Sequence, residues 1–201
     1  MTEDLRIKVE INLREEIYNT GPYVEGVEYH PIPIPSGTES TRFELFEKEY
    51  VKVFNLMAEA DKNPIVLHCQ AGADRTGIMT FGLLTLLGWE YRDISIDYLF
   101  TNFGVQGKRN INDEFNKWWK KLDIYEGKTK AEKCKNWLMS KGIEESKLEH
   151  IREIFIDGYK TKISLAKNRL ELNKSNISRK KISSTKFLKF QKTYDDFEFF
   201  K

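Results

Sequence analysis

Between residues 65 and 88 the chain carries a short apolar run, a loop of small residues and a long apolar run, one directly after another. The first run, 65–67, is typical of a buried central strand. The segment 75–88 predicts a helix that is apolar almost all round and that ends at Gly88, a residue suited to a helix C-terminus. The stretch HCQAGADRTG at 68–77 therefore lies where a strand ends and a core helix begins.

Three segments before this unit also show clear patterns. Residues 6–13 alternate apolar and polar side chains, which predicts a strand with one buried face. Residues 26–35 contain three prolines, which favour extended backbone and remove donors, so we expect an edge strand that runs into a loop. Apolar residues at helical spacing follow Ser and Thr residues over 38–60, and they predict an amphipathic helix.

Helices are expected throughout the C-terminal half. Apolar residues recur at helical spacing in 92–104, 112–122, 130–142 and 144–158, and Asp93 suits the N-cap of the first. The order is thus strand, strand, helix, strand and then helices. This order predicts an α/β fold with a central, mostly parallel sheet flanked by helices and a helical C-terminal half.

Length and charge divide the chain into a body and a tail. At 201 residues it fits one domain with an appendage, and its 40% hydrophobic content excludes a wholly disordered chain. Residues 160–201 hold twelve Lys and Arg against four Asp and Glu, a net charge of +8 within a total of +2, which leaves −6 on the rest. We expect a folded domain over 1–158 and a basic tail over 159–201. Such a tail is a candidate for binding an anionic partner, for example a membrane surface or nucleic acid.

The sequence shows no signal for a membrane or for disulfides. The longest nearly apolar run, 78–89, is shorter than the ~20 residues needed to span a bilayer, and the first thirty residues lack the apolar core of a signal peptide. The only two cysteines, Cys69 and Cys134, need not form a bridge in a domain of this size. We expect no transmembrane segment and a reducing, cytoplasmic location.

The loop at 68–77 has the chemistry of an anion site. Backbone N–H groups of a glycine-containing loop and of a helix N-terminus point toward one centre and attract oxyanions. The same dipoles and the nearby Arg75 would lower the pKa of Cys69 below the value of about 8.5 for a free thiol. Five residues separate Cys69 from Arg75, enough for the loop to circle a tetrahedral oxyanion whose oxygens the guanidinium binds. This geometry suits phosphoryl transfer to sulfur.

This loop resembles that of the cysteine-dependent protein tyrosine and dual-specificity phosphatases, and in particular their bacterial tyrosine-phosphatase-like branch. The motif H-C-x-x-G-x-x-R-[S/T]-G of that family is matched here by His68, Cys69, Gly72, Arg75, Thr76 and Gly77. A weaker similarity extends over about residues 5 to 158. The resemblance implies a phosphatase-like catalytic domain over 1–158. No cluster of Cys, His and carboxylate residues has metal-ligand spacing, so we expect no metal, and we expect no cofactor.

The resemblance also implies a role for each position of the loop. Cys69 would be the nucleophile that forms a cysteinyl-phosphate, and Arg75 would bind the substrate and stabilise the transition state. Thr76 would hydrogen-bond the sulfur and help it leave during hydrolysis, and His68 would hold the loop and tune the thiol. The remaining substrate-binding positions, which mainly supply backbone N–H groups, would be Gln70, Ala71, Gly72, Ala73, Asp74 and Gly77.

Two carboxylates compete for the role of general acid. Most family members place an Asp about thirty residues before the cysteine to protonate the leaving oxygen, but this chain has IPSGTEST there, with Glu39 as the only acid nearby. Glu39 would serve equally well as a helix N-terminal residue. Asp74 is the other candidate, because some bacterial phosphatases with a similar loop are thought to use this aspartate. Its alternative role is to order the loop or to cap the helix.

The substrate expected from the resemblance is a phosphorylated protein or a small phosphate ester. Phosphotyrosine is favoured, with dual specificity for phosphoserine and phosphothreonine as an open alternative. Phosphoinositides are less favoured, because Gln70 and Ala73 stand where phosphoinositide phosphatases often carry lysines. Lys108 and Arg109 are further candidates for contacting a phosphate. Other open interpretations are a catalytically inactive phosphate-binding module, a phosphoinositide or inositol phosphatase, and an arsenate reductase or rhodanese-like sulfur carrier with Cys134 as resolving thiol.

Overall fold

The computed structural model describes residues 5–15, 21–22, 25–36, 43–101, 114–160 and 164. The chain divides into two compact units, Met1–Asp157 and Gly158–Lys201, and most of the described residues belong to the first. Apart from residues 159, 160 and 164, the expected basic tail lies outside the described residues. The boundary between a domain at 1–158 and a tail at 159–201 therefore stays a prediction.

Three parallel strands form the described sheet: β1 (Val9–Asn12), β2 (Glu28–Pro31) and β3 (Ile65–His68). Their order is β2-β1-β3. The register aligns Asn12 with Pro31 on one side and with His68 on the other. The carboxyl ends of all three strands consequently meet at one edge of the sheet, which is where open α/β sheets bind their ligands.

The described sheet differs from the sequence prediction in which strand is central. The segment 65–67 was expected in the middle, but this expectation is wrong for the described strands, because β1 lies between β2 and β3. All four residues of β1 are buried, whereas Val66 in β3 is 38% exposed. Among the strands that the structure describes, the expected edge position of β2 is confirmed.

The expectation of a single buried face for the first strand is wrong for a related reason. The polar side chains of β1, Glu10 and Asn12, are 2% and 1% exposed. Asn12 donates a hydrogen bond to the Tyr29 hydroxyl at 2.9 Å, and Glu10 lies 2.9 Å from a ring nitrogen of His68. Because hydrogen-bonded partners offset the cost of burying polar groups, an alternating strand can be covered on both faces.

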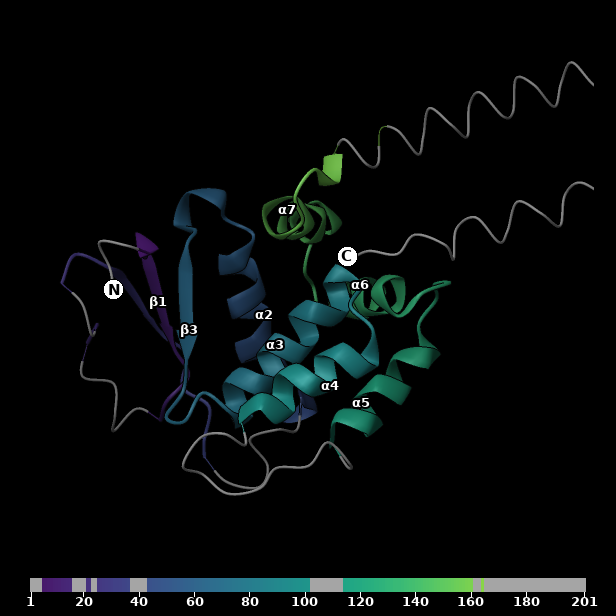
Figure 1. Ribbon diagram of the computed structural model, residues 1–201, viewed down its shortest axis with the longest axis horizontal. Helices are drawn as coiled ribbons and strands as arrows, with labels where there is room; N and C mark the ends of the chain where they lie inside the picture. The colour runs from purple at the N-terminus through teal and green to yellow at the C-terminus, as the bar shows by residue number, and fades with distance from the viewer. Residues whose placement is uncertain are drawn as a thin grey trace, which may run out of the picture. The chain divides into compact units, whose positions relative to one another are not determined.

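Helices make up most of the rest of the described chain (Figure 1). The α-helices and 3₁₀ turns are η2 (Phe43–Leu45), α2 (Glu47–Met57), η3 (Ala60–Lys62), α3 (Asp74–Leu87), α4 (Tyr91–Phe100), α5 (Glu114–Lys121), η5 (Leu122–Ile124), α6 (Lys130–Ser140) and α7 (Glu145–Phe155). The structure confirms the predicted α/β, phosphatase-like fold with a parallel sheet and a helical C-terminal half.

Helix α3 packs against the sheet and against several other helices. It contacts β3 as well as α4, α6 and α7 (Figure 1). Its apolar side chains include Ile78, Met79, Phe81 and Leu86, all of which are at most 1% exposed. The helix ends at Gly88 in a left-handed conformation with φ +92°, as its sequence predicted. The loop before α3 is thus carried by an element that is fixed on several sides.

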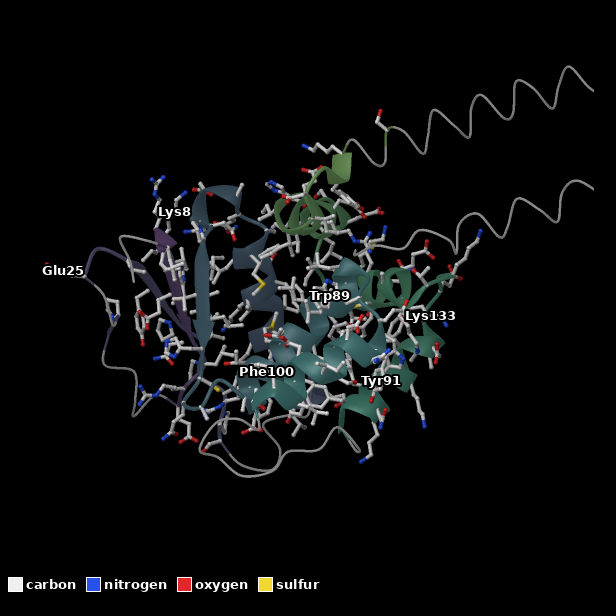
Figure 2. The ribbon with its side chains drawn as sticks, viewed as in Figure 1. Lys8, Glu25, Trp89, Tyr91, Phe100 and Lys133 are labelled. Carbon is white, nitrogen blue, oxygen red and sulfur yellow. The ribbon has the colours of Figure 1, made fainter. Side chains whose placement is uncertain are left out.

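An aromatic cluster joins α3 to α4 and α5. The Phe81 ring meets the rings of Phe115 and Trp118 edge-on, with centroids 4.7 and 5.2 Å apart. Tyr91, labelled in Figure 2, lies at the start of α4, and its ring centroid is 6.2 Å from that of Phe81. Edge-to-face aromatic pairs stabilise such contacts beyond their buried area.

Two helix starts differ from the prediction. The helix expected from residue 38 begins at Glu47, after the η2 turn, and residues 38–42 of that prediction lie outside the described residues. Phe46 precedes this helix without a side-chain cap, while Glu47 and Glu49 place negative charge at its N-terminus, where the helix dipole favours it. In α4 the expected N-cap Asp93 lies inside the first turn instead, and Glu90 occupies the cap position.

Gly77 in the first turn of α3 has a packing role that yields a prediction. A Cβ atom at this position would lie 2.8 Å from two ring carbons of Tyr98 in α4. Tyr98 is 5% exposed and its ring lies 4.1 Å, between centroids, from Phe115, so the ring has little room to move. We expect Gly77→Ala to lower the free energy of unfolding by about 1–3 kcal/mol, measured by urea denaturation.

A second substitution tests the cause of this loss. In a Tyr98→Leu background, Gly77→Ala should cost much less, because the clashing ring is gone. An equal cost in both backgrounds would show that the α3–α4 contact does not explain the glycine.

Candidate active site

The loop between β3 and α3 runs from Cys69 to Ala73. Gly72 adopts φ +68°, a backbone conformation that suits glycine and that turns the loop toward the helix. Cys69 and Ala73 are buried, at 6% and 1% exposure, while the three residues between them are exposed. The loop therefore presents its middle to solvent and keeps the sulfur at its base.

Arg75, in the first turn of α3, is hydrogen-bonded to the segments that follow β1 and β2. Its guanidinium is buried, and Nη1 donates hydrogen bonds to the carbonyl oxygens of Ile34 at 3.0 Å and Leu13 at 3.4 Å. Leu13 directly follows β1, and Ile34 lies three residues after β2. These two contacts fix the orientation of a planar group that can bind an oxyanion with its other donors.

The environment of Cys69 favours the thiolate. Burial alone raises the pKa of this thiol, but the nearby side chain and backbone N–H of Thr76, the backbone N–H of Ala71 and the Arg75 charge lower it further than burial raises it. The net result is a pKa below the ordinary value for cysteine. A lowered pKa increases the fraction of thiolate at a given pH, and the thiolate is the nucleophilic form of cysteine.

His68 links the loop to the central strand. Its Nε2 atom lies 2.9 Å from Oε1 of Glu10, and its Nδ1 atom lies 3.2 Å from the carbonyl oxygen of Cys69. The sequence did not point to Glu10, because an acidic residue at a polar position of an alternating strand is normally expected to face the solvent. Only the parallel pairing of β1 with β3 brings it to the loop.

One family model matches this chain. It describes the tyrosine phosphatase family and covers residues 1–179. The chain belongs to the tyrosine phosphatase family. No curated protein matches the chain significantly. The family match agrees with the resemblance found in the loop sequence, and it extends beyond the residues over which that resemblance was recognised.

In this tyrosine phosphatase family member, the chain itself brings most of the expected site residues together. Arg75, Thr76 and the backbone N–H of Ala71 all act on the sulfur of Cys69. Asp74 is the first residue of α3 and is half-buried. The other proposed general acid, Glu39, and the candidate phosphate contacts Lys108 and Arg109 lie outside the described residues.

A second acid near the loop was also missed by sequence reasoning. Glu15 Oε1 accepts a hydrogen bond of 2.5 Å from the backbone N–H of Ser36. Hydrogen bonds from Ser36 lower the pKa of this carboxyl, and the Arg75 charge lowers it further. Glu15 thus lies within electrostatic reach of Arg75, on the segment that follows β1. Its sequence context gave no signal, because the contact joins two loops.

The second cysteine lies in the core of this family member. Cys134 in α6 is fully buried, and its Sγ lies 3.7 Å from the carbonyl oxygen of Gly82 in α3. Burial raises the pKa of this thiol. Both cysteines are free thiols. A thiol that is buried and protonated is poorly suited to resolve a disulfide at the loop.

The described residues lack two features, a cluster of metal ligands and a helix able to span a membrane. No three His, Cys, Asp or Glu side chains gather there into a group that could hold a metal ion, and the expectation of a metal-free site stays a prediction. Within the same residues, no helix combines the length and the hydrophobicity that crossing a membrane requires.

Proposed function

We propose that this chain hydrolyses phosphate monoesters through a cysteinyl-phosphate intermediate, with phosphotyrosine as the favoured substrate. One observation carries the proposal: the Cys69 sulfur lies in the loop between β3 and α3 beside the buried guanidinium of Arg75, a residue of the first turn of α3, and the pKa of its thiol is lowered. Phosphoryl transfer to an enzyme requires a nucleophile and a group that binds the phosphoryl oxygens. Cys69 and Arg75, which are separated by five residues, would supply these two groups.

The proposed reaction has two steps. In the first, the Cys69 thiolate attacks phosphorus, the bond between phosphorus and the ester oxygen breaks, and the leaving oxygen takes a proton from a general acid. In the second, water attacks phosphorus and gives a proton back to the deprotonated acid, the sulfur–phosphorus bond breaks, and inorganic phosphate and the thiolate are released. Arg75 would bind the phosphoryl oxygens in both steps, and the Thr76 hydroxyl would stabilise the departing sulfur.

We propose Asp74 as the general acid. It directly precedes Arg75 at the N-terminus of α3, so its carboxyl group belongs to the same rigid unit as the nucleophile. Glu39 stays the alternative, because it is the only acid in the segment where most family members place this residue.

Substitutions distinguish the two acids. Asp74→Asn should lower kcat about 100-fold with an alkyl phosphate such as phosphoserine, and much less with p-nitrophenyl phosphate, whose leaving group needs no proton. It should also remove the decline of kcat at alkaline pH, since that decline reports loss of the acid's proton. Glu39→Gln should leave both properties unchanged. Steady-state kinetics over a pH series measures both.

Asp93→Asn provides the matched control, because Asp93 also lies in the first turn of a helix but on α4. It should lose only the small contribution of a charge at a helix N-terminus. If Glu39→Gln instead produces the leaving-group dependence, the assignment of Asp74 is wrong.

The loop composition supports a phosphoprotein substrate over a phosphoinositide. The exposed residues at its rim, Gln70, Ala71 and Gly72, carry no charge, and Ala73 is buried. A multiply phosphorylated headgroup would therefore meet one cation in the loop, Arg75. We also propose a cytoplasmic location and an anionic partner for the basic tail, both from the charge pattern of the sequence.

A substrate panel tests the proposed function. Purified protein is assayed with phosphotyrosine, phosphoserine and phosphoinositide substrates, in the presence of a chelator and with vanadate as inhibitor. The proposal predicts vanadate-sensitive hydrolysis that is fastest with phosphotyrosine. Binding of phosphopeptide without any turnover would identify an inactive phosphate-binding module instead. Arsenate-dependent thiol oxidation would identify a reductase, which the burial of Cys134 argues against.

A further inference from the structure

The segment at the end of β2 has a backbone donor only at every second residue. Residues 31–36 read PIPIPS, and proline has no backbone N–H. The three donors that remain belong to Ile32, Ile34 and Ser36, and all three bond to the end of β1 or to the residues that follow it. The first of them, Ile32, donates to the carbonyl oxygen of Asn12 at 2.9 Å.

The other two donors differ in the kind of acceptor that they meet. The Ile34 N–H donates to the backbone carbonyl of Leu13 at 3.2 Å. The Ser36 N–H donates instead to a side chain, at 2.5 Å from Oε1 of Glu15. The carboxylate of Glu15 therefore continues the series of contacts that joins the segments after β1 and β2.

The same two segments hold the guanidinium of Arg75. Its Nη1 atom donates to the carbonyl oxygens of Ile34 and Leu13, at 3.0 and 3.4 Å. Glu15 and Ser36 each lie two residues further along the chain than these acceptors. The pKa of the Glu15 carboxyl is lowered, mainly by Ser36 and in addition by the Arg75 charge, as expected if the carboxylate lies close to the guanidinium. Separation of the two segments would displace both acceptors of Arg75.

We propose that Glu15 is a positioning residue for Arg75, because its bond to the Ser36 N–H holds together the two segments that orient the guanidinium. The inference rests on the proposed function, since it concerns the group assigned to bind the phosphoryl oxygens. In this role Glu15 exchanges no proton with the substrate. A guanidinium binds two oxygens only when its plane is correctly oriented, so loss of the bond should weaken the binding of an oxyanion.

Three substitutions of Glu15 separate its contact from its charge. Glu15→Gln keeps an oxygen acceptor for Ser36 without the charge, Glu15→Asp keeps the charge on a side chain one methylene shorter, and Glu15→Ala removes both. The readout is the concentration of inorganic phosphate that half-protects Cys69 against alkylation by iodoacetamide. Cys134 is fully buried and should not compete for the reagent.

The contact and the charge predict different orders of the variants. If the contact orients Arg75, the half-protecting concentration should rise about tenfold in Glu15→Ala and Glu15→Asp, and at most about threefold in Glu15→Gln. An unchanged value in Glu15→Ala would overturn the proposal. Equal rises in Glu15→Gln and Glu15→Ala would also overturn it, because the charge would then matter and the contact would not. If Glu15→Ala does not fold, the comparison of Gln with Asp decides the question.

A double substitution tests whether Glu15 acts through the guanidinium. In an Arg75→Lys background, Glu15→Ala should raise the half-protecting concentration by less than about twofold, because the group that it orients is already lost. The same tenfold rise in both backgrounds would contradict the proposal, since Glu15 would then support the loop by another route.

Glu28→Ala is the matched control. The Glu28 carboxylate is also hydrogen-bonded, to Lys62 at 2.5 Å, but it lies at the amino end of β2, opposite to the site. Its removal should leave phosphate protection unchanged, and a rise equal to that of Glu15→Ala would assign the effect to any lost carboxylate near β2. The protection assay requires no turnover, so it can fail independently of the phosphatase assignment, which the substrate panel tests.

Discussion

Replacing Cys69 with serine is expected to abolish hydrolysis, with kcat lower by a factor on the order of 10⁵. The hydrogen bonds and the cation that lower the pKa of the Cys69 thiol cannot ionise a serine hydroxyl near neutral pH. The phosphate-binding groups remain in this variant, because the loop amides and Arg75 do not depend on the sulfur. Steady-state hydrolysis of p-nitrophenyl phosphate measures the loss, and calorimetry with vanadate measures the binding that should persist.

The other cysteine supplies the control for this substitution. Cys134→Ala should retain full activity per folded molecule, since Cys134 is buried between α6 and α3 and has a raised pKa. Its cost should appear as lower thermal stability alone. Substantial turnover by Cys69→Ser would contradict the assignment of the nucleophile, and loss of turnover in Cys134→Ala would point to a second essential thiol.

Arg75→Lys is expected to lower kcat/KM by a factor on the order of 10³, although the positive charge is kept. A lysine ammonium is a point charge that cannot bind two phosphoryl oxygens in one plane. It also cannot reproduce the two hydrogen bonds to Ile34 and Leu13 while facing the substrate. Because part of the electrostatic effect on the thiol remains, alkylation of Cys69 should change far less than catalysis does.

Arg152→Lys is the matched control for this variant. Arg152 of α7 also donates to backbone carbonyls, among them that of Leu86, but it contacts α3 at the end opposite the loop. Its replacement should lower stability and leave kcat/KM unchanged. A similar loss of kcat/KM in both variants would show that arginine in general supports the fold, and it would remove the special role of Arg75.

The loop and the helix that follows it could be predicted from the sequence because both depend on contiguous residues. Six motif positions between His68 and Gly77 are brought together by the local turn alone. The apolar pattern of 75–88 likewise identified a core helix and its end at Gly88. The contiguous motif was therefore sufficient to indicate the phosphatase family, and the family match confirms this assignment.

The sheet order and the supporting acids could not be predicted, because they depend on contacts between distant segments. Parallel pairing of β1 with β3 joins residues more than fifty positions apart and places Glu10 beside His68. Together with the pairing of β1 and β2, it makes β1 the central strand of the described sheet. The hydrogen bond from Ser36 to Glu15 similarly joins two loops after different strands. Buried polar residues with partners are indistinguishable in sequence from residues that face water.

The central claim is that the sulfur of Cys69 takes the phosphoryl group during turnover. Rapid acid quenching of the enzyme during hydrolysis, followed by mass spectrometry of its peptides, tests this claim most directly. The account predicts one phosphoryl group on the peptide that contains Cys69, present during turnover and absent from Cys69→Ser. Steady hydrolysis with no phosphoryl group on Cys69, or with the group on another residue, would contradict it.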